Sequence, residues 1–171
     1  MVVTDVKAPF IVNAYSEPVE VKVRGRVSYL NAMPLSHFFD YMLKQGKRYF
    51  SIDFEDCLVV DSTFLGILAG LAIELRQREP RGICRVFHLS PRNLDLMRHV
   101  GLHKMLEIEE VVPGQSLSGK SVGQGLVTSG DVPKSHLREV IRSAHENLIR
   151  VDEQNKKRFQ DVVSFLKNQS A

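Results

Sequence analysis

The sequence predicts an α/β fold in which a mixed, mainly parallel sheet is covered by helices. Short runs of β-branched and aromatic residues alternate with single amphipathic helices through residues 10–112. Strands that are separated by single helices favour parallel pairing. A length of 171 residues suffices for one ordinary domain of this kind plus an appendage.

The first predicted elements are two short strands and a helix. Residues 10–15 and 19–24 are rich in β-formers, and the valines of the second run alternate with charged residues, as in a half-buried strand. Pro34 opens a helix with an apolar face, and Gly46 ends it. This segment is therefore predicted to contribute two strands and one helix.

The next elements surround a short polar sequence. A strand over 48–54 and the apolar run 58–60 lead into Asp61-Ser62-Thr63 and then into a strongly apolar helix that extends to about Arg78. A strand over 83–89, a helix capped by Ser90-Pro91 and a short strand over 104–109 complete the sheet.

The C-terminal third predicts an appendage. Residues 113–130 are rich in Gly and Ser and are predicted to be a linker, whereas residues 131–171 are predicted to carry one long amphipathic helix over 131–168. Its apolar residues recur at four-three spacing, and Asn155 occupies a position in that seam. Two interpretations remain equal: a homodimer through a coiled coil, or a helix that folds back on its own domain.

Composition narrows the function. A net charge of +3 gives no reason to expect nucleic acid or membrane as the main partner. The two cysteines lie far apart and predict neither a disulfide framework nor a zinc site. The N-terminus lacks the pattern of a signal peptide, and no apolar run reaches transmembrane length. We expect a soluble cytoplasmic protein.

The Asp-Ser-Thr sequence lies where a buried strand enters a helix. Asp61 or Ser62 there can simply cap the helix, because side-chain oxygens accept its free N–H groups. The same position tolerates a phosphate, since the start of a helix carries partial positive charge. A phosphate on Ser62 would add roughly −1.5 to −2 charges, which a partner docked over the corner would have to desolvate.

The helix that follows fits an exposed docking role, but its small residues equally fit close packing onto the sheet, and both interpretations can hold. Its first turns carry small side chains, so that another backbone can approach closely; these residues are Gly66, Ala69 and Gly70. Each glycine costs about 1 kcal/mol of helix propensity relative to alanine, which indicates an offsetting gain in packing or binding.

The stretches Ser51-Ile52-Asp53-Phe54 and Val60-Asp61-Ser62-Thr63-Phe64-Leu65-Gly66, in this order of elements, resemble a STAS domain of the bacterial anti-sigma factor antagonist type. The segment from Val21 to Val27 resembles that family's second strand with its glycine, and Val100-Gly101-Leu102 resembles the close of its last helix. The resemblance covers roughly residues 10–112.

The resemblance implies a regulator that is not an enzyme and uses no cofactor or metal. Ser62 matches the serine phosphorylated by an ATP-dependent anti-sigma factor of the GHKL-type serine kinase class, and a PP2C-type phosphatase would reverse the modification. The unphosphorylated form would bind the kinase and free its client. Asp61, Thr63, Leu65 and Gly66 match the motif around the modified serine.

Three positions depart from the family pattern. Phe64 replaces the usual Gly beside the serine, Ser28 stands where many members carry Asp, and Arg26 replaces an acidic residue. The partner surface, predicted over Arg26, Ser28 and residues 61 and 63–66, is therefore altered and more basic.

Two alternatives remain. One is a phosphorylation-independent STAS scaffold or adaptor in a larger assembly, in which Ser62 is only a cap. The other is nucleotide binding through Gly114–Ser121, which fits the spacing G-x-x-x-x-G-K-[ST]; the glycines that follow it make a poor helix start, and a linker is favoured. Glu55 and Asp56 form an acidic patch for which Mg²⁺ binding has only weak support.

Overall fold

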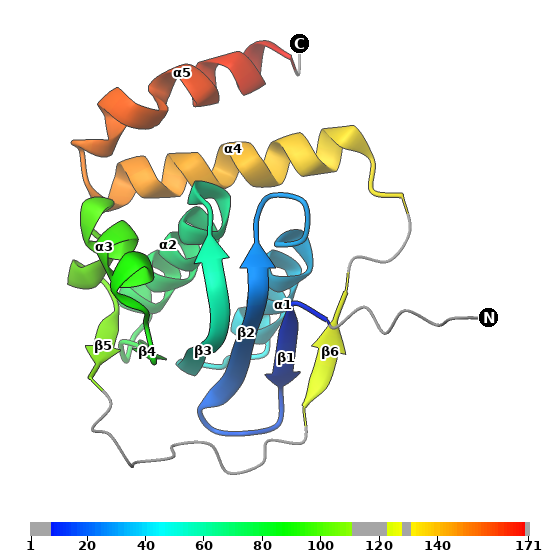
Figure 1. Ribbon diagram of the computed structural model, residues 1–171, viewed down its shortest axis with the longest axis vertical. Helices are drawn as coiled ribbons and strands as arrows, with labels where there is room; N and C mark the ends of the chain where they lie inside the picture. Colours follow the sequence, from blue (N-terminus) through cyan, green and yellow to red (C-terminus); the bar gives the residue numbers. More distant parts are fainter. Residues whose placement is uncertain (1–7, 111–122, 128–130, 170–171) are drawn as a thin grey trace.

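The computed structural model describes residues 8–110, 123–127 and 131–169, and within them six strands form one mixed sheet (Figure 1). Their order across the sheet is β5-β4-β3-β2-β1-β6. The four strands β2 to β5 pair in parallel, whereas β1 pairs antiparallel with β2 and with β6. The strands are β1 (Phe10–Asn13), β2 (Val19–Val27), β3 (Tyr49–Val60), β4 (Ile83–Phe87), β5 (Glu107–Glu109) and β6 (Gln124–Leu126). The predicted mixed, mainly parallel sheet is confirmed.

The strand β3 is the centre of the sheet. It runs through both apolar segments that the sequence indicated separately, and β2 follows it in parallel register from Val19↔Phe50 to Val27↔Val60. The register shifts on either side of Gly25, whose φ of 67° places it in the left-handed region that glycine favours. Both strands end at the same edge, where the Asp-Ser-Thr sequence begins.

Helices α1 (Met33–Lys44) and α2 (Ser62–Gln77) cover one face of the sheet (Figure 1). Aromatic side chains from both layers meet there: Phe39 of α1 packs edge-on against Phe50, and Phe64 of α2 does so against Phe54. Helix α3 (Pro91–His99) begins with Ser90 as its N-cap, and the short 3₁₀ helix η1 (Leu102–Lys104) follows Gly101. The helix order therefore agrees with the sequence pattern.

The C-terminal segment differs from the prediction of one helix over 131–168, which is wrong. Two helices, α4 (Lys134–Val151) and α5 (Asn155–Asn168), are separated by residues 152–154, of which Asp152 has an extended conformation. Asn155 is 1% exposed, and its amide donates hydrogen bonds to the carbonyl oxygens of Leu148 and Val100 at 2.8 and 2.9 Å. Asn155 therefore fixes the turn between α4 and α5 against the domain and does not occupy a coiled-coil seam.

The range predicted as linker contributes a strand. Residues 124–126 form β6, which pairs with β1 from Phe10↔Leu126 to Val12↔Gln124. The whole Gly114–Ser121 loop lies outside the described residues, as do the rest of residues 111–122 and residues 128–130. In the described part of the chain, we find no helix long and apolar enough to cross a membrane.

Candidate functional site

The corner between β3 and α2 is built around Asp61. One of its carboxylate oxygens accepts the backbone N–H of Phe64 at 2.9 Å, and the other accepts the backbone N–H of Tyr29 at 2.8 Å. The backbone N–H of Asp61 donates to the carbonyl of Val27 at 3.2 Å. Asp61 is therefore the N-cap of α2, and it also joins the loop after β2 to the start of that helix.

Because Asp61 caps the helix, the hydroxyl of Ser62 is free for another contact. Its Oγ lies 2.9 Å from Nε2 of His145, which belongs to α4 and follows 83 residues later. The other ring nitrogen, Nδ1, lies 2.7 Å from the carbonyl oxygen of Ile141. Since a carbonyl only accepts, Nδ1 carries the proton in the neutral ring, and Nε2 accepts from the serine hydroxyl.

His145 is held firmly in this position. It is 4% exposed, and its ring packs against Phe159 of α5 with 5.2 Å between ring centroids. Ser62 is half-buried beneath it. The Ser62 hydroxyl is thus tied to α4 by a side-chain hydrogen bond.

The residues after Ser62 are not on a free surface, so the prediction that α2 is exposed is wrong. Thr63, Leu65 and Gly66 are buried. Phe64 is in the core, where its ring also stacks on Phe10 at 6.3 Å between centroids. The remaining face of the helix lies under α4, with Gly66 directly against Ala144.

The exposed part of the corner is formed by the loop after β2 and the end of β3. Arg26 is exposed and Ser28 is half-buried, and the backbone of both is fixed through Asn31, which accepts from the N–H of Ser28 and donates to the carbonyl of Arg26, each at 2.9 Å. Leu30 and Leu58 are 68% and 65% exposed.

Tyr29 is 43% exposed beside them. We call the five residues Arg26, Ser28, Tyr29, Leu30 and Leu58 the corner rim. The sequence patterns did not indicate its apolar members, nor did they indicate His145.

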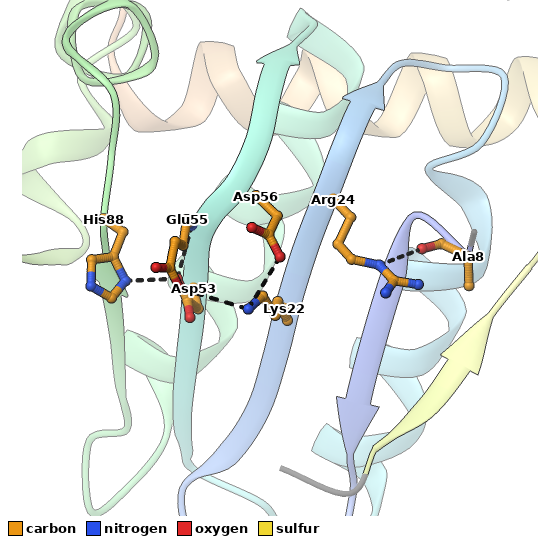
Figure 2. A network of polar contacts seen from close by, with 7 residues as sticks. All are labelled: Ala8, Lys22, Arg24, Asp53, Glu55, Asp56 and His88. Atoms are coloured by element: carbon orange, nitrogen blue, oxygen red, sulfur yellow. Dashed lines mark hydrogen bonds and ion pairs between the residues drawn. The ribbon is translucent and has the colours of Figure 1, made fainter. Parts of the chain in front are cut away.

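A second polar cluster lies on the sheet face opposite α1 and α2 (Figure 2). Lys22 of β2 lies 3.2 Å from Asp56 and 3.7 Å from Glu55. Burial lowers the pKa of Lys22, but its hydrogen bond to Asp56 and the attraction of the neighbouring carboxylates outweigh this effect and raise it. The acidic patch seen in the sequence is therefore part of an ion-pair network.

Asp53 extends this network to the next strand. Its Oδ1 lies 2.8 Å from Nδ1 of His88, which has a positive φ of 57° (Figure 2). Asp53, Glu55 and His88 offer three potential metal ligands within 4.8 Å of one another. The Lys22 ammonium beside them supplies the balancing positive charge, so the arrangement fits an ion-pair network better than a metal centre.

The two cysteines are inert core residues. Burial raises the pKa of the Cys84 thiol to about 12, with the negative charge of Glu107 adding to the effect. Burial also raises the pKa of Cys57 to about 11, although a hydrogen bond from Asn93 opposes the shift. Both are free thiols, and neither carries the thiolate that redox chemistry or metal binding needs.

Comparison with known proteins identifies relatives in structure only. No protein-family model matches the chain, and no curated protein matches it in sequence. The solved structure of the anti-sigma factor antagonist SpoIIAA in its unphosphorylated form is similar with a TM-score of 0.50 and 18% identity, over 60% of this chain and 89% of that one.

An anti-sigma factor antagonist from Mycobacterium paratuberculosis is similar with a TM-score of 0.52 and 19% identity, over 63% of this chain and 92% of that one. At such identities the likeness shows the fold alone. The chain therefore has the STAS-like α/β fold of the anti-sigma factor antagonists.

Proposed function

We propose that this chain is a partner-switching regulator of the anti-sigma factor antagonist type, controlled by phosphorylation of Ser62. The partner docks on the corner rim, and the state of Ser62 decides whether it binds. The kinase is an anti-sigma factor of the GHKL type, and a PP2C-type phosphatase removes the phosphate. This proposal extends the fold likeness to the chain's own site.

One observation carries the proposal: the hydroxyl of Ser62 is not used to cap the helix on which it stands. Asp61 provides the cap through Phe64, so a phosphate on Ser62 leaves that hydrogen bond in place. The first turn of α2 also favours added negative charge. The modification is thus harmless to the helix, which is a requirement for a reversible switch.

The corner rim supplies the surface that a partner would use. Leu30 follows Tyr29, whose backbone N–H binds the capping carboxylate, and Leu58 precedes that carboxylate by three residues at the end of β3; both leucines are exposed by about two thirds. Exposed apolar groups rimmed by polar ones mark protein-interaction sites. Arg26 adds positive charge, so a partner with acidic groups at this position is favoured.

The test begins with the GHKL-type kinases of the source genome, each purified and titrated calorimetrically with the full chain. Ser62→Ala should bind as the wild type does, and Ser62→Asp should bind at least about tenfold more weakly, because the partner must desolvate a fixed carboxylate. Incubation with ATP and the cognate kinase should place phosphate on Ser62, detected by peptide mass spectrometry.

Ser164→Asp is the matched control, since Ser164 is an exposed residue of α5 far along the chain. It adds the same charge and should leave affinity unchanged. Equal binding by Ser62→Ala and Ser62→Asp would refute the switch and favour a phosphorylation-independent scaffold or adaptor.

A further inference from the structure

Helix α4 lies across α2 and covers the face that follows Ser62 (Figure 1). Leu148 is fully buried in this contact and Ala144 is 2% exposed. A methyl group on Gly66 would lie 2.6 Å from the Cβ of Ala144 and closer still to its carbonyl group. The two helix backbones therefore approach closely, which only small residues permit.

The contact between α2 and α4 also contains several polar groups. Besides the Ser62–His145 hydrogen bond, the side-chain amide of Asn147 donates to the carbonyl of Gly66 at 3.3 Å. Polar contacts of this kind are typical of surfaces that separate during function.

One edge of the same contact is open. A cavity of about 400 Å³ lies between α1, α2 and α4, lined by polar groups that include Asp40, Glu74, Ser143, Asn147 and Arg150. Helix α4 is thus packed against the domain along one stripe, and water reaches its side.

The far end of α4 is anchored to the domain. The turn is held by Asn155, and Arg158 of α5 donates to the carbonyl of His99 at 2.6 Å. Lys104 lies 3.7 Å from Asp152 in that turn. If α4 leaves α2, it therefore remains attached beside it, and return is an intramolecular step.

A phosphate on Ser62 removes the hydrogen bond that joins the docked helix to this serine. Phosphorylation replaces the hydroxyl proton that Oγ donates to Nε2 of His145, and it adds three charged oxygens beside a buried ring. The imidazole cannot retreat, because Nδ1 is bonded to Ile141 and Phe159 lies behind the ring. The Asp61 carboxylate, one residue away, repels the added charge.

We propose that α4, which remains anchored at its far end through the turn and α5, forms a cis-acting cap over α2, closed by the Ser62–His145 hydrogen bond and released from α2 by phosphate on Ser62. This deepens the proposed function, on which it rests for the identity of the modified residue. Closure and phosphorylation exclude each other, so each opposes the other by the same free energy. The unmodified chain presents the corner rim with α2 covered, and the modified chain presents α2.

The test needs no partner. Phosphoserine is incorporated at position 62 of a full-length Leu148→Cys variant by codon suppression, and alkylation with N-ethylmaleimide is followed by peptide mass spectrometry. The thiol at position 148 should react at least about tenfold faster with phosphate present, which corresponds to about 1.4 kcal/mol of lost closure. Treatment with a phosphatase should restore the slow rate in the same sample.

Two internal controls separate cap opening from unfolding. Cys84 is buried in the sheet core and should stay unlabelled in both states. Phosphoserine at position 164, on the exposed face of α5, should leave the rate at position 148 unchanged. Amide hydrogen exchange of residues 134–151 in the chain without the cysteine substitution gives the same comparison, because a detached α4 frays.

The cap proposal would be overturned if the thiol at position 148 is alkylated equally fast or more slowly in the phosphorylated chain and the amides of α4 are equally protected from hydrogen exchange. Faster labelling in a chain whose partner binding ignores phosphate would instead leave the cap standing and refute the proposed function. The two results are therefore distinguishable.

Discussion

The pair Gly66→Ala and Gly70→Ala tests the closeness of α4 directly. Both substitutions add one methyl group to α2, and both raise its helix propensity by about 1 kcal/mol. Their surroundings differ: the methyl at 66 meets the backbone and Cβ of Ala144, whereas the methyl at 70 meets the side-chain nitrogen of Asn147 at 2.6 Å. A backbone on a packed helix cannot yield without moving the helix, but a flexible amide can.

The expected magnitudes follow from these contacts. Overpacking costs about 1–3 kcal/mol, so Gly66→Ala should lower the free energy of unfolding by up to about 2 kcal/mol after the propensity gain. At position 70, moving Asn147 forfeits its hydrogen bond to Gly66, about 0.5–1 kcal/mol, which leaves Gly70→Ala near the wild type. Gly66→Ala should therefore be the less stable variant, by up to about 2.5 kcal/mol.

Urea unfolding followed by circular dichroism measures this difference, with the m-value checking that each transition is two-state. Gly66→Ala should also show faster hydrogen exchange in residues 134–151 than Gly70→Ala, because the displaced helix is α4. Equal stability and equal exchange for the two variants would refute the close approach of α4 to α2.

Three further results are expected. Asp61→Ala should lower the free energy of unfolding by about 1–2 kcal/mol through loss of the N-cap, measured by urea denaturation, and an effect no larger than that of Ser62→Ala would contradict the capping assignment. Asn155→Ala should cost about 1–3 kcal/mol in the same assay, because two buried carbonyls lose their donor; a neutral effect would show that the turn is held otherwise. Burial raises the pKa of the Cys84 thiol, so its stabilising contribution is complete below pH 9.0 and is lost as the pH rises toward about 12. Cys84→Ala should therefore reduce the fall of the unfolding free energy with alkaline pH by up to about 1.4 kcal/mol per pH unit, measured by urea denaturation at several pH values. Equal slopes of unfolding free energy against pH for the two proteins would exclude Cys84 as the cause.

Local sequence was sufficient for most of the sheet and its helices. The alternating valines of β2 recur as a half-buried strand, since periodicity reports how many faces an element buries. Pro91 after Ser90 and the positive φ of Gly101 show why α3 begins and ends there. The position of Ser62 at a helix start was likewise predictable.

The hydrogen-bond partners of Asp61 and Ser62 at this helix start were not predictable. Either Asp61 or Ser62 could cap the helix, because both carry an oxygen at a suitable distance from the first turn, and only the path of the chain after β2 assigns the cap to Asp61 through its second bond to Tyr29. The seam position of Asn155 indicated a coiled coil equally well until its carbonyl partners were known.

The order of strands and helices, and the place of Ser62 just after the central strand, depend on residues near one another in the chain and were therefore predictable. What covers Ser62 depends on contacts between distant parts of the fold. His145 lies 83 residues away in the sequence. Its position relative to the apolar residues of α4 is one that occurs in any amphipathic helix. Whether such a helix meets a second chain or its own domain depends on how two distant surfaces fit, and here the thin face around Gly66 receives Ala144 of the same chain.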